Sequence, residues 1–181
     1  MITLVFTVLA VLAIGFTVLV SLRPSEFRVV RTARIAAAPA TVFSHINDFH
    51  KWEAWSPWAK LDPAAKNSFD GKASGTGAIF AWSGNRKVGE GRMMITESRP
   101  SELIRIKLDF FKPFKASNTA QFTFRPDGDR TLVEWSMAGR NNFMGKAIGL
   151  FMDCDKMVGG QFEQGLANLK SVTEGRVTAS V

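Results

Sequence analysis

An uninterrupted apolar segment at the start of the chain constrains its fold more than any other feature. Residues 2–22 contain no charged side chain, and only threonine, serine and glycine interrupt the aliphatic and phenylalanine residues. A helix of about 20 residues is about 30 Å long, which matches the hydrocarbon core of a bilayer. We therefore predict a transmembrane anchor over residues 1–23 and a domain that works beside a lipid surface.

A signal peptide and a buried core helix are the two other interpretations of this segment. A signal peptide needs a basic start, a shorter apolar stretch and a small-x-small cleavage site. The sequence Val20-Ser21-Leu22, followed by Arg23-Pro24, does not provide such a site. A core helix would show some polar periodicity. The segment therefore favours an uncleaved anchor.

Positive charge after the apolar segment predicts its orientation. Arg23, Arg28, Arg31 and Arg34 follow the segment, opposed only by Glu26, and no lysine or arginine precedes it. The positive-inside rule then places the soluble part in the cytoplasm, although a folded domain can also translocate despite its charges. We expect a single-pass membrane protein with a cytoplasmic domain.

The rest of the chain is long enough for one domain with its own core. We predict this domain over residues 27–175, with a flexible tail over residues 176–181. The net charge is +7, but basic and acidic residues are mixed along the chain. We therefore expect no nucleic-acid partner and relate the charge to an anionic membrane leaflet. The 15 phenylalanines and 5 tryptophans, without any tyrosine, predict a large aromatic interior.

Alternation of apolar and polar residues predicts an antiparallel sheet with one dry face. The predicted strands cover residues 27–35, 69–71, 77–82, 86–97, 103–111, 117–125 and 132–138. The predicted helices cover residues 40–46, 49–55, 143–152 and a final stretch to about residue 174. Asp48 and Asp153 or Asp155 are suitable N-caps.

The last predicted helix carries one apolar stripe. Val158, Phe162, Leu166 and Leu169 recur at helical spacing. The simplest way to bury this stripe and the dry face of the sheet is to wrap the curved sheet around the helix. The predicted fold class is therefore α+β, a helix-grip preceded by one transmembrane helix.

Several short motifs in the soluble part carry a family resemblance. They are Arg34-Ile-Ala-Ala-Ala-Pro-Ala-Thr-Val-Phe43, Ile46-Asn-Asp-Phe-His-Lys-Trp52, Trp55-Ser-Pro-Trp58, Trp82-Ser-Gly-Asn-Arg-Lys-Val-Gly-Glu-Gly-Arg-Met93 and Phe162-Glu-Gln-Gly-Leu-Ala-Asn-Leu169. Through them the chain resembles START-like (SRPBCC) proteins, in particular their polyketide cyclase/dehydrase-type branch. The resemblance implies an apolar cavity between sheet and helix that holds a lipid or other hydrophobic molecule, without assigning catalytic residues.

Residue types that carry catalysis or hold metals are sparse. His45 and His50 are the only histidines, and their spacing across a predicted helix break does not suit a shared metal ion. Cys154 lies between two aspartates, which would raise rather than lower its pKa, so we interpret it as a half-buried structural thiol. We expect no cofactor and no metal.

The predicted strand around Met93 leaves two alternatives open. If the face with Gly89, Gly91 and Met93 points inward, the glycines either leave empty volume for a ligand or permit a bend of the strand. If the other face points inward, Glu90 becomes a buried carboxylate that could act as a general acid or base.

Large apolar side chains from several elements are the candidate ligand-binding residues, because an apolar pocket with few polar groups suits an apolar ligand. For any one of them, ordinary core packing is the alternative. The candidates are Trp55, Trp58, Phe80, Trp82, Gly89, Gly91, Met93, Phe110, Phe122, Trp135, Met137, Phe162 and Leu166.

Three functions are compatible with this pattern. The first is a membrane-anchored binding domain for a hydrophobic small molecule or lipid. The second is a cyclase or dehydratase, which would need a titratable group such as Glu90 in the cavity. The third is a co-chaperone-like interaction module, in which side chains fill the cavity and an apolar patch is exposed.

Overall fold

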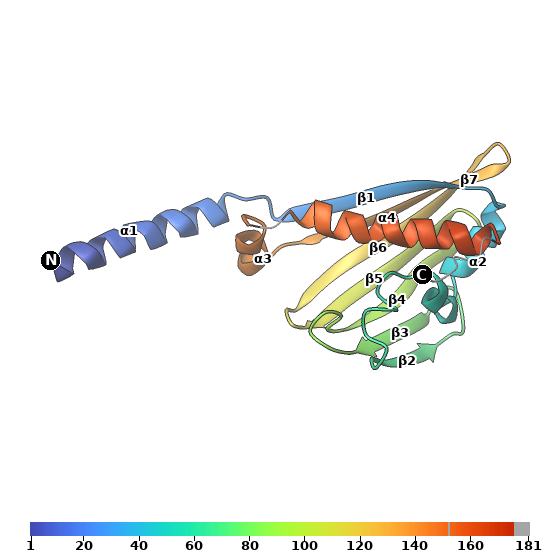
Figure 1. Ribbon diagram of the computed structural model, residues 1–181, viewed down its shortest axis with the longest axis horizontal. Coiled ribbons are helices and arrows are strands. Elements are labelled where there is room, and N and C mark those ends of the chain that lie inside the picture. Colours follow the sequence, from blue (N-terminus) through green and yellow to red (C-terminus); the bar gives the residue numbers. More distant parts are fainter. Residues whose placement is uncertain (152, 176–181) are drawn as a thin grey trace.

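The computed structural model describes residues 1–151 and 153–175. Its first element, helix α1 (Ile2–Ser21), projects away from the rest of the molecule (Figure 1). Val20 is its only buried residue, and the helix is long and apolar enough to cross a membrane. The predicted apolar helix is therefore present, and its side chains find almost no partners within the chain.

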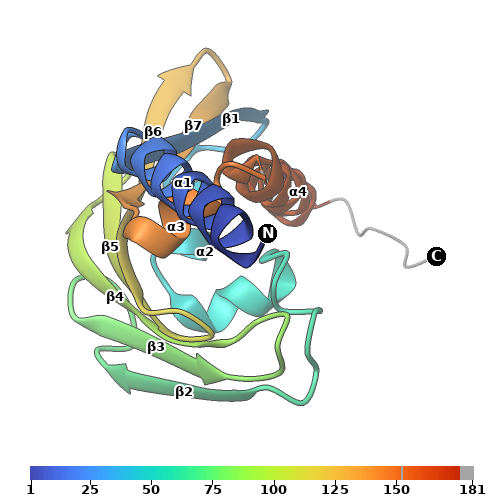
Figure 2. The ribbon, with the colours of Figure 1, turned by 90° about the vertical axis from the view of Figure 1, so that its left-hand side faces the viewer.

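Seven antiparallel strands form one curved sheet. The strands are β1 (Glu26–Ile35), β2 (Lys66–Gly71), β3 (Ala78–Ser83), β4 (Glu90–Arg99), β5 (Leu103–Lys112), β6 (Ala116–Asp127) and β7 (Arg130–Arg140). Their order is β1-β7-β6-β5-β4-β3-β2, so the first and last strands of the chain pair with each other. The register of β4 against β5 shifts twice, and such bulges increase the local bend of a sheet. Figure 2 shows the sheet curling around a concave side.

Short helices close one end of this sheet. Helix α2 (Pro39–Ile46) begins with a proline in its first turn, and the 3-10 helix η1 (Phe49–Ala54) follows at once. The Asp48 carboxylate accepts a hydrogen bond from the backbone N–H of His50 at 3.0 Å and caps η1 as predicted. Figure 1 places α2 at the end of the sheet that is remote from α1.

Two further helices follow the last strand. Helix α3 (Phe143–Ile148) lies beside the end of α1, and helix α4 (Cys154–Thr173) runs along the concave side of the sheet (Figure 1). The Asp153 carboxylate caps α4 by accepting from the backbone N–H of Lys156 at 3.0 Å. Phe162, Leu166 and Leu169 are its buried stripe.

Arg31 fastens the first half of α4 to β1. Its Nε donates to Glu163 at 2.6 Å and its Nη2 donates to Asp155 at 3.0 Å. These bonds, to Asp155 first and Glu163 second, raise the pKa of Arg31, and the bond from Arg31 lowers the pKa of Asp155. Gly159 makes room for the guanidinium, because a Cβ there would lie 1.9 Å from Nη2. The helix is thus held over the edge of the sheet by polar contacts at its start.

The helix-grip prediction is confirmed, with changes at element boundaries. The strand predicted over residues 86–97 begins only at Glu90, because residues 84–89 form a turn in which Gly89 has a φ of +66°. The helix predicted over residues 143–152 ends at Ile148. Residue 152 and the tail predicted over residues 176–181 lie outside the described residues.

Candidate ligand-binding site

Apolar side chains on the inner face of the sheet lie opposite one another in rows that cross the strands. In one such row, Trp135 on β7 lies opposite Phe122 on β6, which lies opposite Ile104 on β5. One row closer to α1, Met137 on β7 lies opposite Ala120 on β6. In the row after that, Leu108 on β5 lies opposite Met93 on β4. This register orders the predicted binding residues from the α2 end of the interior to the α1 end.

The half of the interior next to α2 is packed with aromatic rings. Trp135 stacks on Phe162 of α4 with ring centroids 4.0 Å apart, and on Phe122 with centroids 4.8 Å apart. Trp58 covers Trp135 from the loop after η1. We call this region the filled half; its members, all at most 8% exposed, are Phe43, Trp52, Trp55, Phe122, Phe124, Trp135, Phe162 and Leu166. Five of the predicted binding residues, namely Trp55, Phe122, Trp135, Phe162 and Leu166, are therefore core residues here, and Trp58 packs against them.

Most indole N–H groups in and around this core have a partner. Trp52 donates to the Ile46 carbonyl at 2.9 Å, and Trp55 donates to the His45 carbonyl at 3.2 Å. The Nε1 of Trp135 is the exception: it is buried and has no hydrogen-bond partner among the described residues. A buried donor without an acceptor costs about 1–3 kcal/mol. The stacked Trp135 thus holds one polar atom that a bound molecule or water could satisfy.

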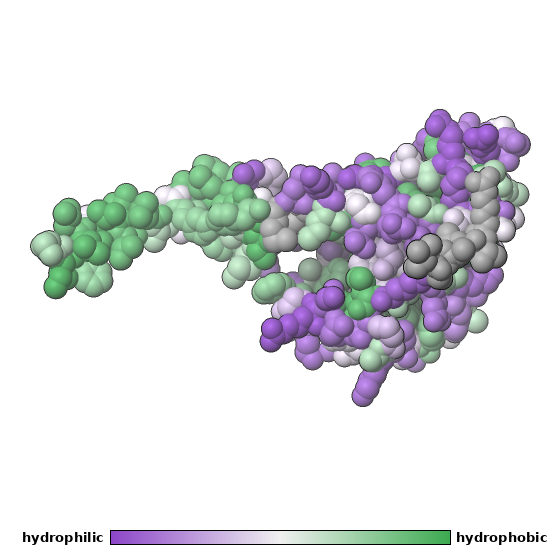
Figure 3. Space-filling view, in the orientation of Figure 1, coloured by the Kyte–Doolittle hydropathy of each residue, from purple (hydrophilic) through white to green (hydrophobic). Residues whose placement is uncertain are grey.

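The half of the interior next to α1 is not fully covered. We call it the open half and define it by Phe27, Phe80, Trp82, Met93 and Phe110, which pack against the core and are all partly exposed. Helix α4 contacts the sheet mainly at β1, and its Phe162 stacks on Trp135 of β7, whereas the last four side chains lie on β3 to β5. Figure 3 shows the surface hollowed between α3 and the β5–β6 hairpin, with hydrophobic atoms at its edge. Met137, 8% exposed, lies at the border of the two halves.

The two candidate glycines of β4 do not leave empty volume. A Cβ on Gly91 would lie 2.5 Å from the Trp82 ring, so this indole already occupies the space. Gly89 lies in the turn before the strand, where its positive φ and the Lys112 carbonyl, 2.3 Å from a built Cβ, require a glycine. The predicted gap beside Met93 is therefore absent at Gly91, because the neighbouring strand fills it.

Asn118 is a polar residue on the inner face that the sequence analysis did not identify. It is 9% exposed and lies on β6 opposite Gly139. A Cβ on Gly139 would lie 2.0 Å from Asn118 Oδ1, so the glycine makes room for the carboxamide. Among the described residues, its Nδ2 has one hydrogen-bond partner, the Met137 sulfur at 4.0 Å, which is a weak acceptor. The period of two that placed Ala120 and Phe122 inward also indicated this side chain.

The titratable candidates lie elsewhere. Glu90 is on the outer face of β4, where its carboxylate pairs with Lys112 at 2.8 Å. Within the described strands β3 to β7, no inward-facing position carries a carboxylate or an imidazole. The described residues also contain no group of His, Cys, Asp and Glu that could hold a metal ion. The side chain of Cys154 lies outside the described part of the chain.

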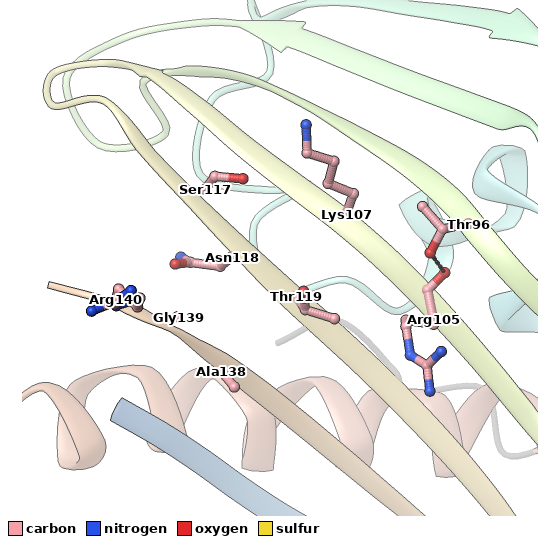
Figure 4. Close-up of a pocket in the computed structure, with 9 residues that line it drawn as sticks. All are labelled: Thr96, Arg105, Lys107, Ser117, Asn118, Thr119, Ala138, Gly139 and Arg140. Carbon is pink, nitrogen blue, oxygen red and sulfur yellow. Dashed lines mark hydrogen bonds between the residues drawn. The ribbon is translucent and has the colours of Figure 1, made fainter. Parts of the chain in front are cut away.

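A second depression lies on the outer face of the sheet (Figure 4). Its lining comes from β4 to β7: Thr96, Arg105, Lys107, Ser117, Asn118, Thr119, Ala138, Gly139 and Arg140. The Arg105 guanidinium pairs with Glu97, and Lys107 pairs with Asp109 at 3.0 Å. Ser117 donates to Asp109 at 2.6 Å, and this bond, aided by Lys107, lowers the pKa of Asp109. Arg105 and Lys107 are thus already neutralised and do not form a charged binding site.

Comparison with known proteins agrees with this architecture. The family described as "Polyketide cyclase / dehydrase and lipid transport" matches residues 26–174, which is nearly the whole chain after α1. No functionally curated protein matches the chain.

Solved structures share the fold at low sequence identity. The Aha1 dimer from Colwellia psychrerythraea is 14% identical with a TM-score of 0.61, and the match covers 83% of this chain and 98% of that one. CalU16 from Micromonospora echinospora is 19% identical with a TM-score of 0.57, covering 83% and 76%. Ara h 8.0201 is 11% identical with a TM-score of 0.55, covering 86% and 99%.

Proposed function

Because this chain belongs to the polyketide cyclase / dehydrase and lipid transport family, we propose that it binds a hydrophobic small molecule or lipid in the open half of its interior. The observation that carries the proposal is the set of large apolar side chains that remain partly exposed on the concave face of β3 to β5. An apolar ligand placed there would remove this surface from water, at about 25 cal/mol per Å².

The filled half sets the depth of the proposed site. Its rings leave the ligand the region bounded by Trp82, Met93 and Phe110, with Met137 at the floor. Of the predicted binding residues, we therefore propose Phe80, Trp82, Met93, Phe110 and Met137 as direct contacts. Trp55, Trp58, Phe122, Phe162 and Leu166 would shape the floor from behind, and Trp135 would do so with its rings while offering its N–H to the ligand.

Two polar groups could orient the ligand. Asn118 lies opposite Leu108 at the border of the open half, and the partner of its Nδ2 among the described residues is the Met137 sulfur. The Trp135 N–H is buried without an acceptor among the described residues. A ligand with one hydroxyl or carbonyl oxygen near its buried end would satisfy a donor that has no good partner, since unmade buried hydrogen bonds are costly.

We further propose that α1 spans a membrane and that the domain lies on the cytoplasmic side. Arg23 and Arg28 follow the helix directly, which supports this orientation. The test is labelling of G128C in a C154S chain with a membrane-impermeant maleimide in intact cells. Labelling only after permeabilisation is the expected result; labelling of intact cells would place the domain outside.

An alternative function is an interaction module, and the filled half favours it because aromatic side chains occupy part of the grip. A bound protein would then contact the exterior, and no ligand would occupy the interior. The catalytic alternative has less support, since Glu90 points away from the interior.

The test of ligand binding compares two methionines on opposite faces of one strand. Met93 faces the open half and Met94 faces outward, and both are half-buried. The full chain, M93R and M94R are purified in mild detergent, and extracted lipids are measured by mass spectrometry. We expect the bound mass to fall by about tenfold in M93R, because a guanidinium in an apolar site is poorly solvated. It should persist in M94R.

Circular dichroism of the three proteins checks that each is folded. Equal bound mass in M93R and M94R, or an empty wild-type protein from several hosts, would refute binding in the open half. In the second case the interaction module becomes the better explanation.

A further inference from the structure

The end of the domain that faces α1 carries a cluster of exposed apolar side chains. Phe111 and Phe114 lie at the β5–β6 hairpin, Phe143 and Met144 lie on α3, and Phe151 and Met157 lie around the start of α4. Each is between 44% and 80% exposed. We call this set the apolar end. Clustered exposure of this kind marks an interaction surface in a soluble domain.

The opposite end of the domain lacks this feature. Its turns, residues 72–77, 99–102 and 127–129, contain none of the exposed large hydrophobic side chains. Two ion pairs lie in or beside these turns, Arg34 with Asp127 at 2.7 Å and Arg99 with Glu102 at 3.8 Å. The apolar side chains are therefore concentrated at one end and are not a general property of the surface.

Basic residues accompany the apolar end. Arg23, Lys115, Arg140, Lys146 and Lys156 lie around it, and among the described residues none of them has a carboxylate within ion-pair distance. A surface that combines apolar side chains with unpaired cations is complementary to an anionic lipid interface. An apolar protein groove would not need the cations.

The apolar end is continuous with α1. The Lys146 Nζ donates to the Ser21 carbonyl at 3.3 Å, and the Asn141 N–H donates to the Ser25 carbonyl at 2.6 Å. Val20 of α1 is fully buried, and α1 packs on α3. Figures 1 and 3 show α3 beside the hydrophobic helix, with the β5–β6 hairpin on the same side of the domain.

We propose that the apolar end is a membrane-docking surface that inserts into the anionic leaflet from which α1 emerges. Phe114 and α3 enter the interface between headgroups and acyl chains, while Lys115 and Lys146 contact lipid phosphates. The hollow between α3 and the hairpin then opens towards the lipid. This inference uses the membrane span of the proposed function, but it does not require that a ligand is bound.

The experiment measures the depth of single labels in the full chain. A C154S chain carries an environment-sensitive fluorophore at M144C or, as the matched site at the opposite end, at G128C. Each protein is reconstituted in vesicles of equal parts phosphatidylcholine and phosphatidylglycerol. Quenching by nitroxide on lipid acyl chains reports insertion, and quenching by aqueous iodide reports exposure. We expect nitroxide to quench position 144 and iodide to quench position 128.

Two substitutions separate docking from folding. F114D should reduce nitroxide quenching at position 144. Insertion of the phenylalanine side chain increases partitioning of the domain end into the membrane by at least about tenfold, and the substitution removes this contribution. F69D, at a 43% exposed site on β2, is the control and should leave it unchanged. Pure phosphatidylcholine vesicles, or K115E, should each reduce the docked fraction by about fivefold, because the attraction between Lys115 and anionic lipid is then absent.

Each of the other outcomes overturns the proposal. Iodide accessibility at position 144 equal to that at position 128 would show that the end stays in water. Shielding from both quenchers, increasing with protein density, would instead identify contacts between copies of the chain. Co-flotation with vesicles and extracted lipid mass, measured on the same samples, report separately on the membrane span and the proposed ligand.

Discussion

The two halves of the interior are built from similar residues and differ in what covers them. In the filled half, α4 and the loop after η1 lie across the sheet, so that Trp55, Phe122 and Trp135 are almost completely buried. In the open half, Trp82, Met93 and Phe110 have the same apolar chemistry but stay partly exposed, and α4 contacts the sheet mainly at β1. Stability and the proposed binding therefore belong to neighbouring parts of one sheet.

This difference shows why aromatic content alone does not locate a binding site. Trp135 and Trp82 each contact at least two rings, but Trp135 is 3% exposed and belongs to the core, whereas Trp82 stays partly exposed and leaves surface for another molecule. The register of the sheet decides whether a given ring is covered or partly exposed, because it fixes the distance between that ring and α4. The following predictions test this division.

The largest expected effect is the loss of stability caused by W135A. Removing the stacked indole leaves a cavity between Phe122 and Phe162, and such truncations cost about 3–5 kcal/mol. W82A loses ring contacts with Phe80 and Phe110 and one hydrogen bond to the Val88 carbonyl, but this indole is already partly exposed, so the expected cost is smaller, at about 2–3 kcal/mol. Urea titrations in detergent, followed by circular dichroism, measure both. Equal costs would erase the distinction between the halves.

The next effect concerns the close approach of α4 to the filled half. A Cβ at Gly165 would lie 2.8 Å from the Trp135 ring and 3.1 Å from Pro57, so G165V should overpack the core by about 1–3 kcal/mol. Gly160, on the same helix, has nothing within 4 Å of a built Cβ. G160A should therefore stabilise by about 0.5–1 kcal/mol through helix propensity. A tolerated G165V would mean that the filled half is loosely packed.

A smaller effect is expected where α4 begins. R31M removes the bonds to Asp155 and Glu163, so backbone amides in the first turns of α4 should exchange faster with deuterated water. Amides around Phe162 and Leu166 should change less, because packing holds them. R28M, which removes only a 3.5 Å surface pair with Glu134, is the control. Uniform acceleration along α4 would contradict a local clamp.

The smallest expected effect is a pH dependence of stability that comes from Asp109. This residue lies on the outer face of β5, behind the open half. The folded structure lowers the pKa of Asp109, through the hydrogen bond from Ser117 and then Lys107. Its contribution to stability is therefore present above the ordinary carboxyl pKa of about 3.9 and is lost as the pH falls through the lower folded value. The site is close to solvent, so D109N should cost less than about 1 kcal/mol at neutral pH.

The free energy of unfolding of D109N should therefore fall less steeply with decreasing pH than that of the wild-type protein. D129N alters a turn carboxylate that is 90% exposed and provides the comparison. If both variants reduce the pH dependence of the free energy of unfolding equally, the hydrogen bond from Ser117 has no specific role.

The sequence was sufficient for the strands and for the stripe of α4. Alternation around Ile104, Ile106 and Leu108 assigned the correct face, because these three side chains of β5 are buried while the residues between them face outward. The N-caps at Asp48 and Asp153 were visible because a cap is a local interaction between residues close in the chain.

The division of the interior could not be read from the sequence. Whether Gly91 leaves space depends on Trp82, which reaches it through the pairing of two strands. Whether Phe110 or Phe122 is covered depends on the path of α4, and alternation does not encode that path. Asn118 was readable from its position among inward-facing residues, but its lack of a strong partner follows only from the three-dimensional neighbours.

The connection between α1 and β1 consists of residues 22–25 only. Four residues span at most about 14 Å when extended. With α1 in a bilayer, the domain cannot leave that bilayer to reach another one. Any molecule that it takes up is drawn from, and released to, the immediate surroundings of its own leaflet, so the protein would act as a fixed local station rather than as a shuttle between compartments.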